Sequence, residues 1–150
     1  MEQLQYLNNI QFNGDKRLLK GKIKLIKKTV VKIVKSHKKQ CLYINFNLIS
    51  DDELLEININ NLKHNYYTDV ITFNYSDNSL LIEGDSYISI DRIVDHSSTY
   101  NVTPFEELLR VIIHSTLHLC GLNDQTKQEK EKMTKQENKF LKLFHEEHNS

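Results

Sequence analysis

The sequence predicts an α+β fold, in which a small mixed sheet of about four strands supports one central helix, with other helices around it. Three observations carry this prediction. Apolar residues recur at spacings of three and four in several long segments, which is the period of amphipathic helices. Shorter segments alternate apolar and polar residues, as half-buried strands do. Between positions 104 and 120 apolar residues cover most of the helix circumference, so we expect that helix to be central and buried.

Size and composition indicate one domain spanning residues 1–150, because 150 residues with 39% apolar content suit a single hydrophobic core. Met1–Asn13 lacks a basic segment followed by an apolar run, and no segment approaches the ~20 apolar residues of a membrane span. Cys41 and Cys120 are the only cysteines, too few for a disulfide scaffold, so each is expected to be a buried thiol. We therefore expect a cytoplasmic protein that does not bind membranes.

The amino-terminal part predicts a strand, a turn and a long basic helix. Leu4–Asn8 is a weak strand candidate, and Asn13–Asp15 supplies turn residues after it. From Lys16 to about His37, apolar residues recur at helical spacing while lysines fill the opposite side. Between Lys16 and Lys39 there are eleven Lys or Arg and no Asp or Glu, although the formal net charge of the chain is zero. This basic helix is either a solvated face or a surface for phosphate groups, and composition does not decide between them.

The next segment predicts a strand and a capped helix. Cys41–Ile49 alternates, with Leu42 at the start of its apolar side, as expected for a half-buried strand. Ser50 and Glu53 have the spacing of a capping box, in which each side chain satisfies a backbone N–H of the other residue. The helix that they begin should end at Lys63–Asn65, where the apolar period stops.

Two β-rich segments, Val70–Asn74 and Leu80–Asp91, follow and should form a hairpin or neighbouring strands across a polar turn. Arg92–Tyr100 predicts a short helix. The last helix is expected from Thr126 to His148, with Thr126 and Glu129 at capping-box spacing. Its predicted contact stripe consists of Met133, Phe140, Leu141 and Phe144.

The central helix has three concordant start signals: the capping hydroxyl of Thr103, Pro104 at the first helical position, and Glu106 placed to reach back. It should extend to about Cys120.

This helix carries the most specific motif in the chain, the pair His114 and His118. Histidines four apart project from one helix face about a turn apart, a separation that lets two imidazoles bind one metal ion. Gly121 can adopt the left-handed conformation and turn the chain, so that Asp124 comes back towards the two rings. Two imidazoles and a carboxylate leave a position for water, as catalytic zinc sites do. On the residues alone, a metal site and two unliganded histidines stay as alternatives.

Other polar residues are weaker candidates. His64 and His96 are expected to be exposed but are candidates to approach the site. Asp85 and Asp91 are candidates to accept a hydrogen bond from a ligand imidazole, with a structural turn role as the alternative.

The segment from His114 to Asp124 resembles the signature of the YbeY family of bacterial metal-dependent endoribonucleases, His-Gly-x-Leu-His-Leu-x-Gly-Tyr-Asp-His, whose three histidines bind the metal. The chain departs from this signature at four positions, where it has Ser115, Leu122, Asn123 and Asp124. The resemblance implies that the ligands are His114, His118 and Asp124, with the third altered in kind.

Two upstream segments resemble the same family. Tyr67–Phe73 is similar to its Thr-Asp-Val-Leu-Ser-Phe segment, and Gly84–Asp91 to its Gly-Asp-Ile-x-Ile-Ser strand. The three segments together cover roughly residues 56 to 124. An arginine that serves catalysis in the family lies six residues before the Thr-Asp pair, where this chain has Leu62. Lys63 is the adjacent cation, so a positive charge from Lys63 is an alternative for that role.

The resemblance implies a single-strand-specific endoribonuclease that acts in rRNA processing, at the 3′ end of the small-subunit rRNA, and in ribosome quality control. It implies one divalent metal ion as cofactor, with zinc the expected ion. The expected partners are ribosomal RNA and the small ribosomal subunit, and not DNA. No catalytic residue beyond the metal ligands is identified.

Two alternatives are kept. One is a metal-stabilised, ribosome-associated RNA-binding factor that cleaves nothing, which Leu62 in place of the arginine favours. The other, more remote, is a zincin-like metallopeptidase. Zincins have a glutamate as general base directly after the first histidine, whereas Ser115 has a pKa far too high to take the proton of water.

Overall fold

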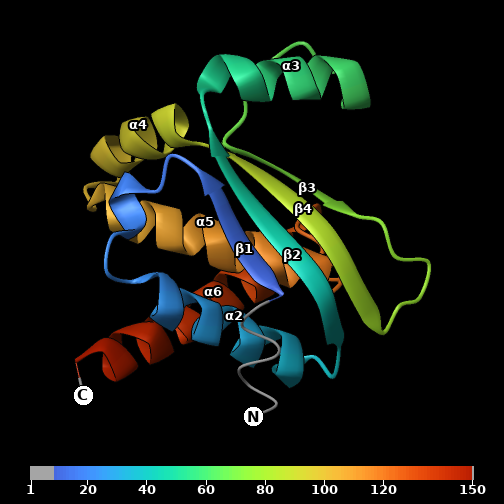
Figure 1. Ribbon diagram of the computed structural model, residues 1–150, viewed down its shortest axis with the longest axis vertical. Helices are drawn as coiled ribbons and strands as arrows, with labels where there is room; N and C mark the ends of the chain where they lie inside the picture. The colour runs from blue at the N-terminus through green and yellow to red at the C-terminus, as the bar shows by residue number, and fades with distance from the viewer. Residues whose placement is uncertain (1–8, 150) are drawn as a thin grey trace.

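A computed structural model describes residues 9–149 and shows a four-stranded mixed sheet with most of its helices packed on one face (Figure 1). The strand order is β1-β2-β4-β3. Strand β2 (Gln40–Ile49) pairs in parallel with both β1 (Ile10–Gly14) and β4 (Leu81–Ser89), while β3 (Val70–Asn74) is antiparallel to β4. The predicted α+β class, the four strands and the pairing of the two β-rich segments are therefore confirmed.

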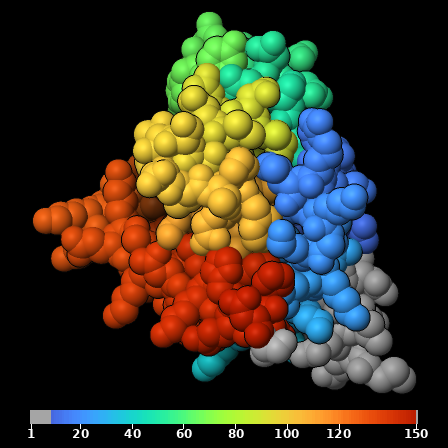
Figure 2. All heavy atoms as spheres, turned by 90° about the vertical axis from the view of Figure 1, so that its left-hand side faces the viewer, coloured from blue at the N-terminus to red at the C-terminus, as the bar shows by residue number. Residues whose placement is uncertain are grey.

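The helices are α2 (Ile23–Ser36), α3 (Asp51–Leu62), α4 (Ile90–Tyr100), α5 (Pro104–Leu119) and α6 (Lys127–His148), with a short 3-10 turn η1 (Arg17–Leu19) before α2. Helices α2, α5 and α6 lie behind the sheet in Figure 1, and α3 lies across its upper end. The side view in Figure 2 shows α4, the start of α5 and the end of α6 next to one another, with α3 above them. Within the described residues, no helix is both long and apolar enough to cross a membrane.

Strand β1 includes a residue that was expected to belong to a turn. The candidate strand Leu4–Asn8 lies outside the described residues. Strand β1 occupies Ile10–Gly14. Asn13, expected in a turn, is therefore part of the strand, and only Gly14, with φ of 90°, begins the change of direction. The pairing of β1 with β2 overrides the local turn preference, because Ile10 and Phe12 gain buried positions by it.

The basic segment was predicted to be one continuous helix, but it forms two elements, η1 and α2. Gly21 has φ of 79°, in the left-handed region, and separates η1 from α2. The apolar stripe of the segment is nevertheless buried as expected, at Ile26, Val30, Ile33 and Val34.

Strand β2 contains an irregularity that places the side chain of Leu42 on the exposed face. The pairing with β4 shifts register between Cys41 and Tyr43, so that Cys41 is buried and Leu42 is 44% exposed. A residue inserted into one strand of a pair moves all residues before it to the opposite face. The expected inward position of Leu42 is therefore wrong, while Ile44, Phe46 and Leu48 are buried as predicted.

The helix ends follow the predicted capping signals with two differences. Both bonds of a capping box are present at Ser50 with Glu53 and at Thr126 with Glu129. Ser89 caps α4, which therefore begins at Ile90 instead of Arg92 and shortens the preceding strand. Thr103 accepts from the backbone N–H of Glu106. The carboxylate of Glu106 does not reach back, because it pairs with Nε2 of His145 on α6 at 2.8 Å.

Helix α5 is central, as predicted. Its residues Leu108, Leu109, Ile112, Ile113 and Leu117 are fully buried. Its carboxyl end lies very close to the sheet, because a Cβ on Gly84 of β4 would be 2.7 Å from Cδ2 of Leu119 and 2.9 Å from the carbonyl oxygen of Phe73. This contact fixes how far the end of α5 stands from β4 and β3.

Candidate metal centre

The three predicted ligands come together at the carboxyl end of α5. The Nε2 atoms of His114 and His118 lie 3.4 and 3.5 Å from the same atom, Oδ2 of Asp124. One possible ligand atom from each residue lies within 4.8 Å of the other two. The two rings are nearly perpendicular, with centroids 4.5 Å apart. Both nitrogens thus point to one location beside a carboxylate, which suits a single divalent ion with further positions for water or substrate.

The turn after α5 explains the position of Asp124. Gly121 has φ of 102°, its N–H donates to the carbonyl of His118, and the N–H of Leu122 donates to that of Leu117. These two bonds, with a left-handed glycine between them, are the Schellman motif that ends a helix and reverses the chain. The role expected of Gly121 is confirmed, and Asp124 reaches the imidazoles from the returning segment.

The other nitrogen of each imidazole is already bound. Nδ1 of His114 lies 2.6 Å from Oε2 of Glu137 on α6, and Nδ1 of His118 lies 2.9 Å from the carbonyl oxygen of Leu122. A carboxylate and a carbonyl only accept, so each neutral ring carries its proton on Nδ1 and its lone pair on Nε2. This is the tautomer that a metal ligand needs, and the partners hold each ring in its orientation.

Glu137 is the residue at this candidate site that the sequence analysis missed. Its residue exposure is 6%, and its other oxygen accepts from Nη1 of Arg110 at 2.8 Å, which stabilises the ionised carboxylate in this buried position. A signal for it exists in the sequence, because Glu137 lies four residues after Met133 and four before Leu141. It is an acid in the apolar stripe of α6, where only a paired charge is tolerated.

Burial by itself lowers the pKa of His114. The hydrogen bond and charge of Glu137, together with the negative charges of Asp124 and Asp69, act in the opposite direction and raise the pKa above its ordinary value. A proton therefore competes with a metal ion for His114 at a higher pH than it would for an unperturbed histidine.

The three candidate ligands line a cavity of about 530 Å³ between α5, β3 and the end of α3. Leu62 and His64 lie on its wall. Of the two histidines named as candidates to approach the site, His64 and His96, it is therefore His64 that borders this cavity. Lys63 is the C-cap of α3, is exposed, and is not part of the wall. Among the described residues no lysine or arginine lines this cavity, so Lys63, the alternative named for the role of the family arginine, is not part of the lining.

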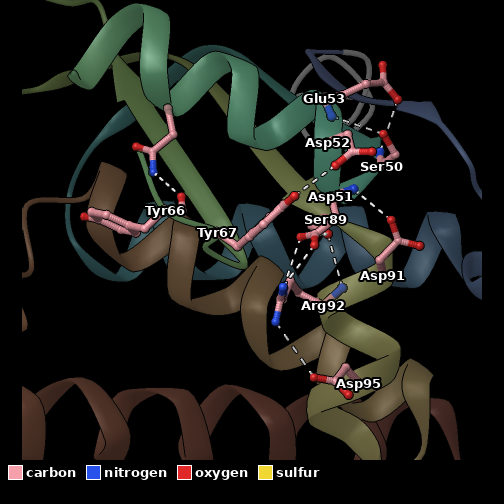
Figure 3. Close-up of polar contacts among 11 residues, drawn as sticks. Ser50, Asp51, Asp52, Glu53, Tyr66, Tyr67, Ser89, Asp91, Arg92 and Asp95 are labelled. Atoms are coloured by element: carbon pink, nitrogen blue, oxygen red, sulfur yellow. Dashed lines mark hydrogen bonds and ion pairs between the residues drawn. The ribbon is translucent and has the colours of Figure 1, made fainter. Parts of the chain in front are cut away.

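The segment between α3 and β3 that forms this wall is held in place from several sides. Arg92 donates two hydrogen bonds to the carboxylate of Asp51, at 3.1 and 3.0 Å (Figure 3). Its guanidinium lies 5.1 Å from the ring centre of Tyr67. The hydroxyl of Tyr67 donates to Asp52, and the Nδ2 of Asn58 donates to the carbonyl of Tyr66. These contacts join α3 and α4 across the segment and restrict its movement.

The remaining polar candidates have structural partners. Asp91 accepts from the backbone N–H of Asp51 at 2.8 Å (Figure 3), and Asp85 accepts from Tyr75 and Asn45 on the sheet. Neither binds a ligand imidazole, so the structural alternative applies to both.

Cys41 and Cys120 are buried, as expected, and burial raises the pKa of each thiol to about 12. Neither thiol lines the cavity of His114, His118 and Asp124.

Comparison with known proteins agrees with the motif. The family model described as Endoribonuclease YbeY matches residues 9–145. The endoribonuclease YbeY of Parabacteroides distasonis is 38% identical over 143 residues, 95% of each chain, and that of Cytophaga hutchinsonii is 44% identical over 111 residues, 74% of this chain and 78% of the relative. The solution structure of TM1509 from Thermotoga maritima covers 93% of this chain and 91% of its own, with a TM-score of 0.68 and 26% identity.

We expect Glu137→Gln to weaken Zn²⁺ binding by about 10- to 100-fold at pH 8, because an amide holds the His114 ring less strongly than a carboxylate does. Affinity is measured by competition with a chromogenic chelator. The charge of Glu137 is one of the causes that raise the pKa of His114, so its loss should lower that pKa. On acidification the Zn²⁺ affinity of the variant should therefore begin to fall at a lower pH than that of the wild type. Glu131→Gln, at an exposed position on the same helix, is the control. Wild-type affinity and pH dependence in Glu137→Gln would refute this role.

Proposed function

The chain belongs to the YbeY family, and we propose that it is a metal-dependent endoribonuclease that cleaves single-stranded RNA with an ion bound by His114, His118 and Asp124. The observation that carries this proposal is the convergence of two Nε2 lone pairs and a carboxylate on the floor of an open cavity. Following the family, we propose the 3′ end of small-subunit rRNA as the substrate, and the small ribosomal subunit as the cytoplasmic partner, with a further role in ribosome quality control.

A divalent ion held by His114, His118 and Asp124 would lower the pKa of a bound water towards about 7, or would polarise an oxygen of the scissile phosphate. The protein supplies the frame for this chemistry. His114 and His118 present Nε2 because Glu137 and the carbonyl of Leu122 hold the Nδ1 protons. Asp124 adds a negative charge next to the two rings.

The charge of the cavity makes the ion necessary for substrate binding as well. Asp69 and Asp124 both line it, and no lysine or arginine of the described residues does. A phosphodiester entering this cavity without a bound cation meets two carboxylates and is repelled. We therefore infer that metal-free protein binds the scissile phosphate poorly, whatever contacts RNA makes elsewhere.

The peptidase alternative loses further support. Ser115, which stands where a zincin has its general base, is fully buried and accepts a hydrogen bond from Ser86 of β4 at 3.0 Å. The residue is directed into the core between α5 and the sheet. One observation still supports the alternative of a non-cleaving RNA-binding factor. Leu62 puts an apolar side chain on the cavity wall at the position of the family arginine.

The metal-loaded protein is expected to cleave a single-stranded RNA oligonucleotide. His118→Ala is expected to abolish cleavage and to lose the ion held by His114, His118 and Asp124, because that three-ligand site loses one of its donors. Cleavage is followed on denaturing gels and metal content by elemental analysis. His148→Ala, an exposed histidine on α6, should behave as wild type. Wild-type protein that retains metal and binds the RNA without cutting it would establish the binding-factor alternative instead.

Asp124→His, which restores the family residue, should shift the pH optimum of cleavage downward and favour zinc over manganese. A carboxylate is a harder ligand than imidazole and adds a charge, so the ion it holds is a weaker Lewis acid and its water has a higher pKa. The measurement is the pH–rate profile with each metal, with Asp124→Asn as the variant that removes the charge but keeps the shape. Identical profiles for wild type and Asp124→His would show that Asp124 is not a ligand.

The basic segment from Lys16 to Lys39 is proposed to bind the RNA backbone away from the cavity. Several of its lysines have intramolecular partners: Lys32 pairs with Glu147 at 2.7 Å, Lys39 donates to the carbonyl of Ser79, and Lys22 lies over the ring of Phe105. The test therefore uses other lysines of α2.

Replacing Lys24, Lys27 and Lys28 together by glutamine should weaken RNA binding and flatten its dependence on salt. If each lysine neutralises one phosphate, the slope of log K against log salt should change by about 2, at about 0.7 per phosphate on single strands. The matched control replaces Lys127, Lys130 and Lys135 on α6, which alters the net charge equally at exposed positions elsewhere. An unchanged slope in the α2 variant would mean that these lysines are a solvated face.

A further inference from the structure

A second group of metal-ligating side chains lies outside the centre described above. It consists of Asp69, just before β3, His96 on α4 and Glu107 on α5, and one possible ligand atom of each lies within 4.8 Å of the other two. Nδ1 of His96 is 3.8 Å from Oδ2 of Asp69. His96, which was only a candidate to approach the first centre, thus faces this group instead. The three residues come from separate elements that converge through the tertiary fold.

Glu107 is the most informative member, because a buried carboxylate requires a partner. It is 6% exposed, and the groups that act on its carboxylate do so through their charge, Asp69 and His96 first among them, and not through a hydrogen bond. It lines a second cavity, of about 560 Å³, together with Asp69. Arg110 lines the same cavity, but its guanidinium is bound to Glu137 and Asn138, at 2.8 and 2.9 Å. Burial of an ionised carboxylate without a nearby positive charge or proton costs folding free energy.

Electrostatics add to this imbalance. Burial raises the pKa of Glu107, and the negative charge of Asp69 raises it further, while His96 and Arg110 act in the opposite direction. Two converging carboxylates repel each other unless a proton or a cation lies between them. A divalent cation bound between the two carboxylates removes this repulsion.

We propose that Asp69, His96 and Glu107 bind a second divalent cation. The donors are two carboxylate oxygens and one imidazole nitrogen, a harder set than that of the first centre, which favours Mn²⁺. Bonds of about 2.0–2.2 Å to each donor require only a small inward movement of side chains from their present separations. The frame is fixed, since the carbonyl of Asp69 accepts from the N–H of Ser89, and the N–H of Glu107 donates to the carbonyl of Thr103.

The proposed cation also has a place in the electrostatics of the first centre. Asp69 lines both cavities, and its charge acts on His114. A cation bound to Asp69 therefore neutralises one of the two carboxylates that face an incoming phosphate. It would place positive charge beside a cavity whose described lining contains no lysine or arginine. Binding of the cation itself does not depend on the proposed RNA cleavage.

The number of bound Mn²⁺ ions per chain tests the proposal directly. The full chain is equilibrated by dialysis with excess Mn²⁺ and no RNA, and bound metal is measured by elemental analysis. Wild type should retain two ions. Glu107→Gln, which keeps the shape of the side chain, should retain one, as should His96→Asn. His118→Ala should also retain one, at the second site, and adding Glu107→Gln to it should leave none.

Asp95→Asn is the matched control, because Asp95 precedes His96 on α4 but has a side chain that is 70% exposed, and it should retain two ions. Circular dichroism establishes that each variant is folded. A single Mn²⁺ in the wild type, or two in both folded Glu107→Gln and folded His96→Asn, would overturn the proposal. A failure of the proposed function has a different signature, since wild type would then bind two ions and leave RNA intact.

Discussion

Burial of α5 between the sheet and the other helices is the constraint on which the rest of the structure depends. A helix in that position must be apolar on most of its surface, and any polar side chain on it needs a partner close by. His114 and His118 meet this requirement with one nitrogen each, through Glu137 and the carbonyl of Leu122. The two remaining nitrogens lie where the carboxyl end of the helix opens onto the cavity of the metal centre. The same burial thus fixes the fold and leaves two oriented donors at the surface.

Prediction from sequence succeeded where the signal is local. Ser50 with Glu53 and Thr126 with Glu129 define helix starts within four residues, and Gly121 permits the turn that returns Asp124 to the histidines. The family resemblance implied the three candidate ligands His114, His118 and Asp124, and it too rests on short segments of sequence. These features depend on neighbouring residues and on helix geometry, so the chain specifies them before any tertiary contact forms.

Features that depend on distant contacts could not be predicted in the same way. The outward turn of Leu42 follows from its register with β4, which no local pattern reveals. Glu137 meets His114 across 23 positions, and Glu107 meets Asp69 and His96 only after α4, α5 and the sheet have packed. In each case burial of a polar group, or exposure of an apolar one, contradicts the local pattern. Such contradictions mark the positions where tertiary packing takes precedence.

The bond between Glu137 and His114 joins two elements that are separate in the chain, and this has a consequence for motion. Helix α6 must be docked for the imidazole of α5 to keep its orientation, so docking and ion affinity are thermodynamically linked and the linkage is reciprocal. A fluctuation that lifts α6 away removes the acceptor from Nδ1 and weakens the grip on the ion. Conversely, a bound ion makes that opening rarer. The carboxyl-terminal helix is therefore expected to exchange its amide hydrogens more slowly when the centre is filled, although no residue of α6 belongs to the ligand set.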